Sequence, residues 1–266
     1  MEKKKEVIDH IVGWMKEYAE GARISGFVVG ISGGIDSAVV SALAAMTGMR
    51  VACVTLPIHQ AAIHVDRAEE HIAWLKERYT NIEALDLDLT GPYDRFIRDL
   101  PVTVDEDRQH LVNANTRSRL RMVALYYVGG LNNLLVAGTG NKIEDFGVGF
   151  FTKYGDGAVD ISPIADLTKT EVYGLAEELG IVESIRVAPP TDGLFGDDRS
   201  DEDQIGASYP ELEWAMEQAE TGARPEDFTG RQREVFELFL HRNRINRHKM
   251  DPIPVCQVPE HLRKKK

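Results

Sequence analysis

The string Gly30-Ile31-Ser32-Gly33-Gly34-Ile35-Asp36-Ser37 combines residue types that bind phosphate. Glycines permit a tight turn and let backbone N–H groups approach an anion closely. The helix expected after the string adds unpaired N–H donors at its positive end, and Ser32 and Ser37 add hydroxyl donors. Asp36 is an anion in a site for anions, which a bound Mg²⁺ would explain because this ion joins carboxylates to substrate phosphates. The string therefore predicts a phosphate site with magnesium; the alternative is a structural turn in which Asp36 caps the helix.

Other nucleotide and nucleophile motifs fit this string less well. A Walker A loop needs a Lys after the glycines, and the dinucleotide fingerprint needs G-x-G-x-x-G; the string has neither. Gly30 to Gly34 does fit G-x-S-x-G, the nucleophile elbow of α/β-hydrolases, and Asp166 and His248 follow Ser32 in the right chain order. The elbow would fall on the first strand, with no room upstream for an oxyanion-hole loop. A hydrolase that uses Ser32 is thus a distant alternative.

The elements that must position the string alternate along the chain. Apolar runs predict strands over residues 27–32, 50–57, 82–90 and 132–140, and helical periodicity predicts helices over 6–20, 36–48, 64–79, 107–128, 211–220 and 225–244. This alternation indicates an α/β fold: a doubly wound, mostly parallel sheet with helices on both faces and functional loops at the carboxyl ends of the strands. The Pro-, Gly- and Asp-rich segment 186–208 is expected to be a mobile lid loop.

Composition narrows the class of protein. The 266 residues, a length that fits one domain over 1–266, carry 31 Lys and Arg against 43 Asp and Glu, a formal net charge of −12. This acidic balance argues against sequence-independent binding of nucleic acid. No apolar run approaches the roughly 18 residues of a membrane span, no signal peptide is evident, and Cys53 and Cys256 form no disulfide framework. We expect a cytoplasmic enzyme that binds neither nucleic acid nor membrane.

Several blocks carry a resemblance to a known family. SGGIDS (32–37) matches the pyrophosphate loop of the N-type ATP pyrophosphatases, which have a Rossmann-like, adenine nucleotide alpha hydrolase-like fold. The segments NANTRSRLRM (113–122), GTGNKIED (138–145), GFFTKYGDGAVDISPIADLTKT (149–170), DEDQIGASY (201–209) and HKMDPIPV (248–255) resemble, in order, the ammonia-dependent NAD synthetases. The superfamily also amidates or thiolates other substrates, so a ligase that acts on a different carboxylate is the main alternative.

The resemblance implies an activity and its partners. The reaction would be the ATP-dependent amidation of deamido-NAD (nicotinic acid adenine dinucleotide) by ammonia, giving NAD, AMP and pyrophosphate through an acyl-adenylate. Mg²⁺ would be held by Asp36 and Glu144, and the chain would form a homodimer. A fused glutaminase would need a further domain with a nucleophilic Cys, so we expect free ammonia as the donor. A separate glutaminase subunit is possible, but nothing in the sequence indicates one.

The resemblance also assigns residues to the two large substrates. For ATP it implies Gly30, Ser32, Gly33, Gly34, Asp36, Ser37, Gln60, Thr139, Lys169 and Thr191, with Asp36, Ser37 and Lys169 catalytic. For deamido-NAD it implies Asn115, Arg119, Phe151, Lys153, Asp160, His248 and Lys249. Thr55 stands where the family often has Arg, so the adenine and ribose contacts there depart from the pattern.

Overall fold

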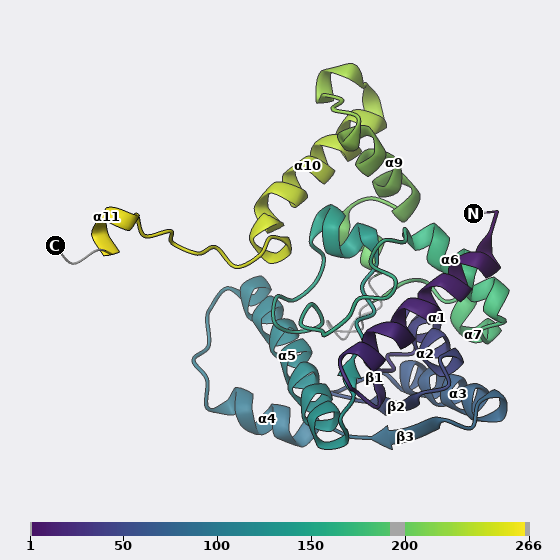
Figure 1. Cartoon of the computed structure of the whole chain (residues 1–266). Helices are drawn as coiled ribbons and strands as arrows, with labels where there is room; N and C mark the ends of the chain where they lie inside the picture. The colour runs from purple at the N-terminus through teal and green to yellow at the C-terminus, as the bar shows by residue number, and fades with distance from the viewer. Residues whose placement is uncertain (1, 192–199, 264–266) are drawn as a thin grey trace.

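A parallel sheet organises the computed structural model, which describes residues 2–191 and 200–263 (Figure 1). In the described residues the sheet has four strands in the order β3-β2-β1-β4. They are β1 Gly26–Gly30, β2 Arg50–Thr55, β3 Ile82–Asp86 and β4 Leu135–Val136. Val28 of β1 lies opposite Ala52 of β2 and Val136 of β4, and every pairing is parallel. The α/β fold with a parallel sheet is confirmed.

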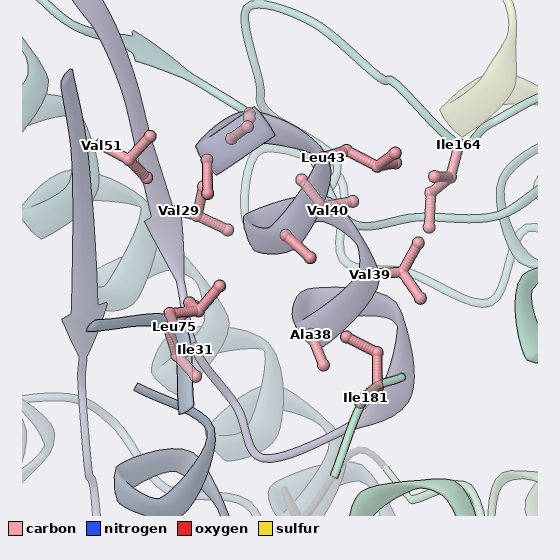
Figure 2. Close-up of a cluster of buried hydrophobic side chains, with 14 of the residues drawn as sticks. Val29, Ile31, Ala38, Val39, Val40, Leu43, Val51, Leu75, Ile164 and Ile181 are labelled. Atoms are coloured by element: carbon pink, nitrogen blue, oxygen red, sulfur yellow. The ribbon is translucent and has the colours of Figure 1, made fainter. Parts of the chain in front are cut away.

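Several helices cover one face of the sheet and enclose the main core. They are α1 Lys4–Gly21, α2 Ile35–Met46, α3 Ala62–Arg78, α6 Lys169–Leu179 and α7 Glu183–Arg186. The Ala- and Val-rich α2 is buried on most sides because it packs between the sheet, α1 and α6. Figure 2 shows Val29 and Val51 of the sheet facing Val40 and Leu43 of α2. This packing fixes the end of α2 that follows the glycine string.

The opposite face of the sheet is covered mainly by α5 Glu106–Asn132, beside which α4 Thr90–Arg98 lies. Val28 and Val54 point to this side, because successive strand residues face opposite ways, and they share a hydrophobic core with Val128 of α5. Most of α5 is outside this core, since only four of its residues are buried. No helix in the described ranges is long and apolar enough to cross a membrane.

A second, smaller core stands over the carboxyl ends of the strands. It joins the π-helix η1 Ile143–Val148 to α8 Asp201–Ile205, α9 Tyr209–Glu220 and α10 Gly230–Met250. The 3-10 turn η2 Pro225–Asp227 lies against α10. After α10 the chain extends away from the body to α11 Glu260–Arg263 (Figure 1). The glycine string thus lies between the sheet core and this helical layer.

Some predicted boundaries were wrong. The strand expected over 132–140 is only Leu135–Val136, because α5 continues to Asn132 and ends with Asn133 in the left-handed conformation at φ 55°. The strand expected over 82–90 ends at Asp86, and α4, α6 and η1 were not anticipated. Within the expected lid, residues 201–205 form α8, which starts with a Ser200–Asp203 capping box. Residues 192–199 lie outside the described residues, so the lid stays a prediction.

Candidate active site

The glycine string forms a tight loop between β1 and α2. Gly33 has φ +81°, and a Cβ there would lie 2.5 Å from the carbonyl oxygen of His64, so only glycine fits. The Ser32 and Ser37 hydroxyls are 3.1 Å apart, and the Ser37 hydroxyl donates to the Gly34 carbonyl at 3.0 Å. Gly34 is the N-cap of α2, and no side chain in the described residues caps this helix. The alternative in which Asp36 caps the helix is therefore wrong. The first N–H groups of α2 remain suited to an anion.

This loop borders a cavity of about 290 Å³ at the carboxyl ends of the strands. Every residue expected at ATP lines it: Gly30, Ser32, Gly33, Gly34, Asp36, Ser37, Gln60, Thr139, Lys169 and Thr191. Glu144 and Phe151 line the same cavity. The fold therefore brings together residues from five separate segments of the chain, as expected for one nucleotide site.

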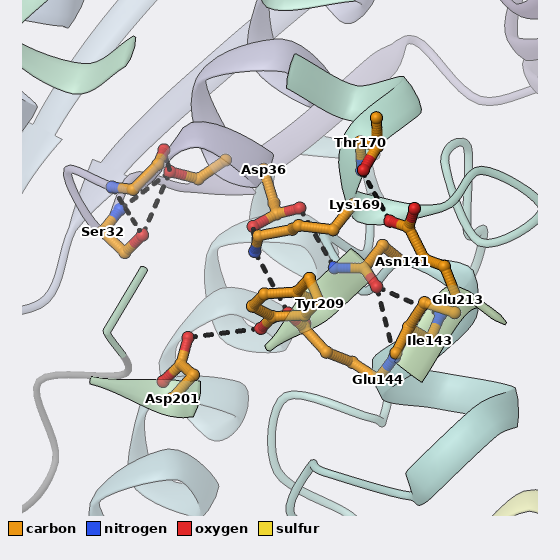
Figure 3. Close-up of polar contacts among 12 residues, drawn as sticks. Ser32, Asp36, Asn141, Ile143, Glu144, Lys169, Thr170, Asp201, Tyr209 and Glu213 are labelled. Atoms are coloured by element: carbon orange, nitrogen blue, oxygen red, sulfur yellow. Dashed lines mark hydrogen bonds and ion pairs between the residues drawn. The ribbon is translucent and has the colours of Figure 1, made fainter. Parts of the chain in front are cut away.

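An ion-paired lysine joins the two expected metal-binding carboxylates (Figure 3). Lys169 Nζ lies 2.6 Å from Asp36 Oδ2 and 3.1 Å from Glu144 Oε1, and its side chain is only 3% exposed. Burial would lower the pKa of Lys169, but the carboxylates of Asp36 and Glu144 outweigh burial and raise it. The lysine is therefore a permanent cation between the two acids.

Asn141 connects the same two acids and was missed in the sequence. Its Nδ2 donates to Asp36 Oδ1 at 3.3 Å, and its Oδ1 accepts from the backbone N–H groups of Ile143 and Glu144. The Asn141 side chain thus binds the first N–H groups of the π-helix and also orients Asp36. π-helical turns often occur at functional sites. The signal was present, because Asn141 lies inside the block GTGNKIED.

Tyr209 and Asp201 complete this cluster and were also missed. The Tyr209 hydroxyl donates to Glu144 Oε1 at 2.5 Å and lies 3.4 Å from Asp201 Oδ2. The ring centroid is 4.8 Å from Lys169 Nζ. Burial and the neighbouring carboxylates raise the pKa of Tyr209, so its hydroxyl stays a proton donor. Asp201 falls within the segment 186–208 that was expected to be a lid loop, and the structure buries it beside this cluster.

Most residues expected at deamido-NAD form a second cluster around 149–154 instead of lining the cavity. The Arg119 guanidinium donates to the Lys153 carbonyl at 3.3 Å, and Lys153 Nζ donates to the His248 carbonyl. Lys249 Nζ donates to the Phe151 carbonyl at 2.9 Å. Asn115 Oδ1 accepts from the Thr152 hydroxyl at 2.8 Å. These contacts place the cluster directly behind Phe151, which faces the cavity.

Asp160 lies apart from both groups. Its Oδ2 accepts from the Val136 N–H at 2.8 Å and its Oδ1 from the Tyr126 hydroxyl at 3.1 Å. It borders a separate depression with Trp14 and Tyr18. In this conformation Asp160 ties β4 to α5, and its role at the dinucleotide stays a prediction.

The corner in which the family's Arg is replaced has a different arrangement. Thr55 Oγ1 donates to Asp86 Oδ1 at 2.7 Å. The threonine hydroxyl is thus hydrogen-bonded to a residue of the neighbouring strand β3. Gln60 Oε1 accepts from Arg121 at 2.9 Å, and Arg121 also donates to the Leu56 carbonyl. Arg121 lines the cavity and was missed, although it lies two residues after Arg119 in the same block.

The hydrolase alternative finds no assembled triad in the described residues. The Ser32 hydroxyl contacts Ser37 and Gly34, His248 Nδ1 contacts the Ile245 carbonyl, and Asp166 borders the separate depression. A nucleophilic serine needs its base within hydrogen-bond reach, so the arrangement does not support this alternative.

Comparisons with known proteins identify the family of the chain. The family model described as NAD synthase matches residues 7–253. The NH(3)-dependent NAD(+) synthetase of Carboxydothermus hydrogenoformans is 34% identical over 246 residues, 90% of this chain and 95% of that protein. The protein of the same name from Methanosarcina mazei is 36% identical over 257 residues, 94% of this chain and 97% of that protein.

Solved structures give the same result. The NH3-dependent NAD synthetase from Campylobacter jejuni, in complex with the nitrate ion, has a TM-score of 0.76 at 25% identity, covering 96% of this chain and 100% of that one. The NMN synthetase from Francisella tularensis has a TM-score of 0.81 at 29% identity, covering 97% and 98%. The chain therefore belongs to the NAD synthase family and is a ligase that forms a C–N bond.

Proposed function

We propose that the cavity catalyses the ATP-dependent amidation of deamido-NAD by ammonia, which yields NAD, AMP and pyrophosphate. The observation that carries the proposal is the convergence of Asp36, Glu144 and Lys169 beside the glycine loop, in a chain of the NAD synthase family. Cation and carboxylates meet where an open helix N-terminus can hold phosphate.

The reaction has two balanced steps. The nicotinate carboxylate attacks the α-phosphorus of ATP, a C(=O)O–P bond forms, and pyrophosphate leaves as the bond to the β-phosphate breaks. Ammonia then attacks the acyl carbon, loses a proton and displaces AMP. The protein supplies positioning and charge: the loop N–H groups and Lys169 stabilise the departing pyrophosphate, so no side chain acts as nucleophile.

The residues around Lys169 fit a magnesium ion. The carboxylates of Asp36 and Glu144 contact this one ammonium. Asp201 also raises its pKa, so the group has an excess of negative charge. The described residues contain no cluster of three or more His, Cys, Asp or Glu side chains arranged to hold a metal ion by themselves. The two carboxylates suit Mg²⁺, because this ion binds one or two carboxylates and completes its coordination shell with phosphate oxygens and water. We assign its protein ligands to Asp36 and Glu144, where the ion would neutralise charge on the ATP phosphates.

The cluster behind Phe151 would hold deamido-NAD, and α5 would form a homodimer interface. Asn115 and Arg119 lie on α5, and a guanidinium suits the phosphates and carboxylate of this substrate. The same helix exposes large apolar side chains, with Tyr127 and Leu131 each 72% exposed. An exposed apolar face of this kind is typical of an interface. A cytoplasmic location stays a prediction.

The assay combines purified protein, Mg-ATP, deamido-NAD and ammonium, and measures NAD and AMP. We expect one NAD for each AMP and no NAD without ammonium; glutamine alone gives none unless a glutaminase is added. Nicotinic acid mononucleotide is the competing carboxylate, because the NMN synthetase of Francisella tularensis has a similar structure. ATP cleavage only with that or another acid would contradict the substrate assignment.

A further inference from the structure

The hydrogen bonds to Glu144 are unevenly distributed over its carboxylate. Lys169 Nζ and the Tyr209 hydroxyl both reach Oε1, at 3.1 and 2.5 Å. Oε2 receives no hydrogen bond from the described residues. Two donors on one oxygen fix the rotation of the carboxylate about its last bond and leave the other oxygen available as a metal ligand.

The two donors differ in how firmly they can hold Glu144. Lys169 Nζ also pairs with Asp36, whose Oδ2 is closer, at 2.6 Å, than Glu144 Oε1, at 3.1 Å. Because the lysine side chain is flexible, its ammonium can move toward either carboxylate. The Tyr209 hydroxyl is on a rigid ring, and this residue is 3% exposed and packs within the smaller core. The tyrosine is therefore the firmer support of Glu144.

The backbone of Tyr209 is held from both sides. Its N–H donates to Glu202 Oε1 at 2.8 Å. The preceding residue, Ser208, is the N-cap of α9 and forms a capping box with Glu211. A capping box fixes the first turn of a helix, so the position of the Tyr209 ring follows from α9.

A third contact fixes α9 relative to Lys169. The Thr170 N–H, next to Lys169 at the start of α6, donates to Glu213 Oε1 at 2.8 Å. Glu213 lies one helical turn after Tyr209 on α9. The lysine and the tyrosine therefore approach Glu144 from two helices that are tied together.

We propose that Tyr209 is a positioning residue that orients Glu144 for metal binding, with its hydroxyl holding Oε1 and leaving Oε2 available as a ligand. This inference rests on the proposed metal site. Tyr209 is not among the residues that line the cavity, so its phenol would act through the Glu144 carboxylate and not by touching ATP or the metal. Support of this kind around a metal ligand changes metal affinity by about 10–100-fold when it is removed.

The test measures binding of Mn²⁺, an oxygen-seeking stand-in for Mg²⁺, by electron paramagnetic resonance in the presence of an α,β-methylene analogue of ATP. Tyr209→Phe keeps the ring and removes only the hydroxyl. We expect its Mn²⁺ dissociation constant to rise about tenfold. In turnover, the apparent KM for Mg²⁺ rises likewise, while kcat at saturating Mg²⁺ stays near that of the unmodified enzyme.

Tyr79→Phe is the matched control, because it removes a phenol hydroxyl from a half-buried tyrosine at the end of α3, away from the cavity. Its Mn²⁺ affinity should be unchanged. Glu144→Gln separates the inference from the function on which it rests. Weak Mn²⁺ binding in Glu144→Gln with normal binding in Tyr209→Phe would overturn the role of Tyr209 alone. Normal binding in both variants would overturn the metal site as well.

Discussion

The two sides of the cavity are built in different ways. One side is backbone: the loop of residues 30–37 depends on the left-handed Gly33 and on the open N-terminus of α2. The other side is made of side chains, in which Asn141, Lys169 and Tyr209 hold two carboxylates (Figure 3). Asp36 belongs to both sides, because its backbone lies in the first turn of α2 and its carboxylate contacts the Lys169 ammonium.

This difference decides how each side responds to change. A backbone site depends on the conformation of a few consecutive residues, so it fails when that conformation becomes strained. A side-chain site depends on partners from η1, α6 and α9. Substituting one of these side chains therefore weakens the site but leaves the contacts of the other side chains in place. Variants on each side should therefore have distinguishable effects.

The largest effect is expected for Asp36→Asn, because Asp36 joins the two sides. The amide keeps the shape but removes the charge that pairs with Lys169 at 2.6 Å and that would hold the metal. Turnover should fall by on the order of 10²–10³-fold, with the circular dichroism spectrum unchanged. Asp166→Asn, at the separate depression, is the control and should keep its activity. Near-normal turnover of Asp36→Asn would remove this residue from the metal site.

Gly33→Ala tests the backbone side by itself. The change forces alanine to φ +81° and places its Cβ 2.5 Å from the His64 carbonyl oxygen. Left-handed strain costs about 1–2 kcal/mol, and the collision adds about 1–3 kcal/mol. Denaturant unfolding should show this loss, and the KM for ATP should rise.

Gly48→Ala is the matched control for strain without collision. Gly48 has φ +73°, and an added Cβ would meet nothing within 4 Å. The unfolding free energy of Gly33→Ala should therefore lie below that of Gly48→Ala. Equal losses in the two variants would mean that the His64 carbonyl yields, and that the loop tolerates a side chain.

The same contrast explains what the sequence could predict. The backbone side was predictable because a tight anion loop needs glycines and hydroxyls in consecutive positions, and residues 30–37 supply them. Lys169 and Glu144 were identified only through the resemblance, since nothing in their local sequence shows that they meet. Tyr209 was missed because its contact with Glu144 spans 65 positions. The shortened β4 was missed because Asn133 adopts a left-handed cap that composition does not reveal.

The smallest effect on stability is expected for Arg231, which acts on the helix that carries Tyr209 and not directly on the two carboxylates of the site. Arg231 donates to both oxygens of Glu211, at 2.7 and 2.9 Å, and Glu211 caps the helix that carries Tyr209. The Arg231 hydrogen bonds, helped by Ser208, lower the pKa of Glu211 from 4.5 to about 2. Because an exposed ion pair contributes little in water, Arg231→Ala should lower Tm by about 2 °C or less at pH 7.

The pH dependence identifies the origin of this loss. A carboxyl whose pKa is lower in the folded state stabilises the protein above its unfolded pKa and loses that contribution as pH falls. The Tm difference between the unmodified protein and Arg231→Ala should thus be present above pH 4.5 and shrink as pH falls toward 2. Arg233→Ala, which removes an ion pair to Glu237 within α10 and leaves Glu211 paired with Arg231, serves as control, and its Tm difference should not follow the titration of Glu211. A difference that stays constant from pH 7 to pH 2 would show that Arg231 acts through packing and not through the charge of Glu211.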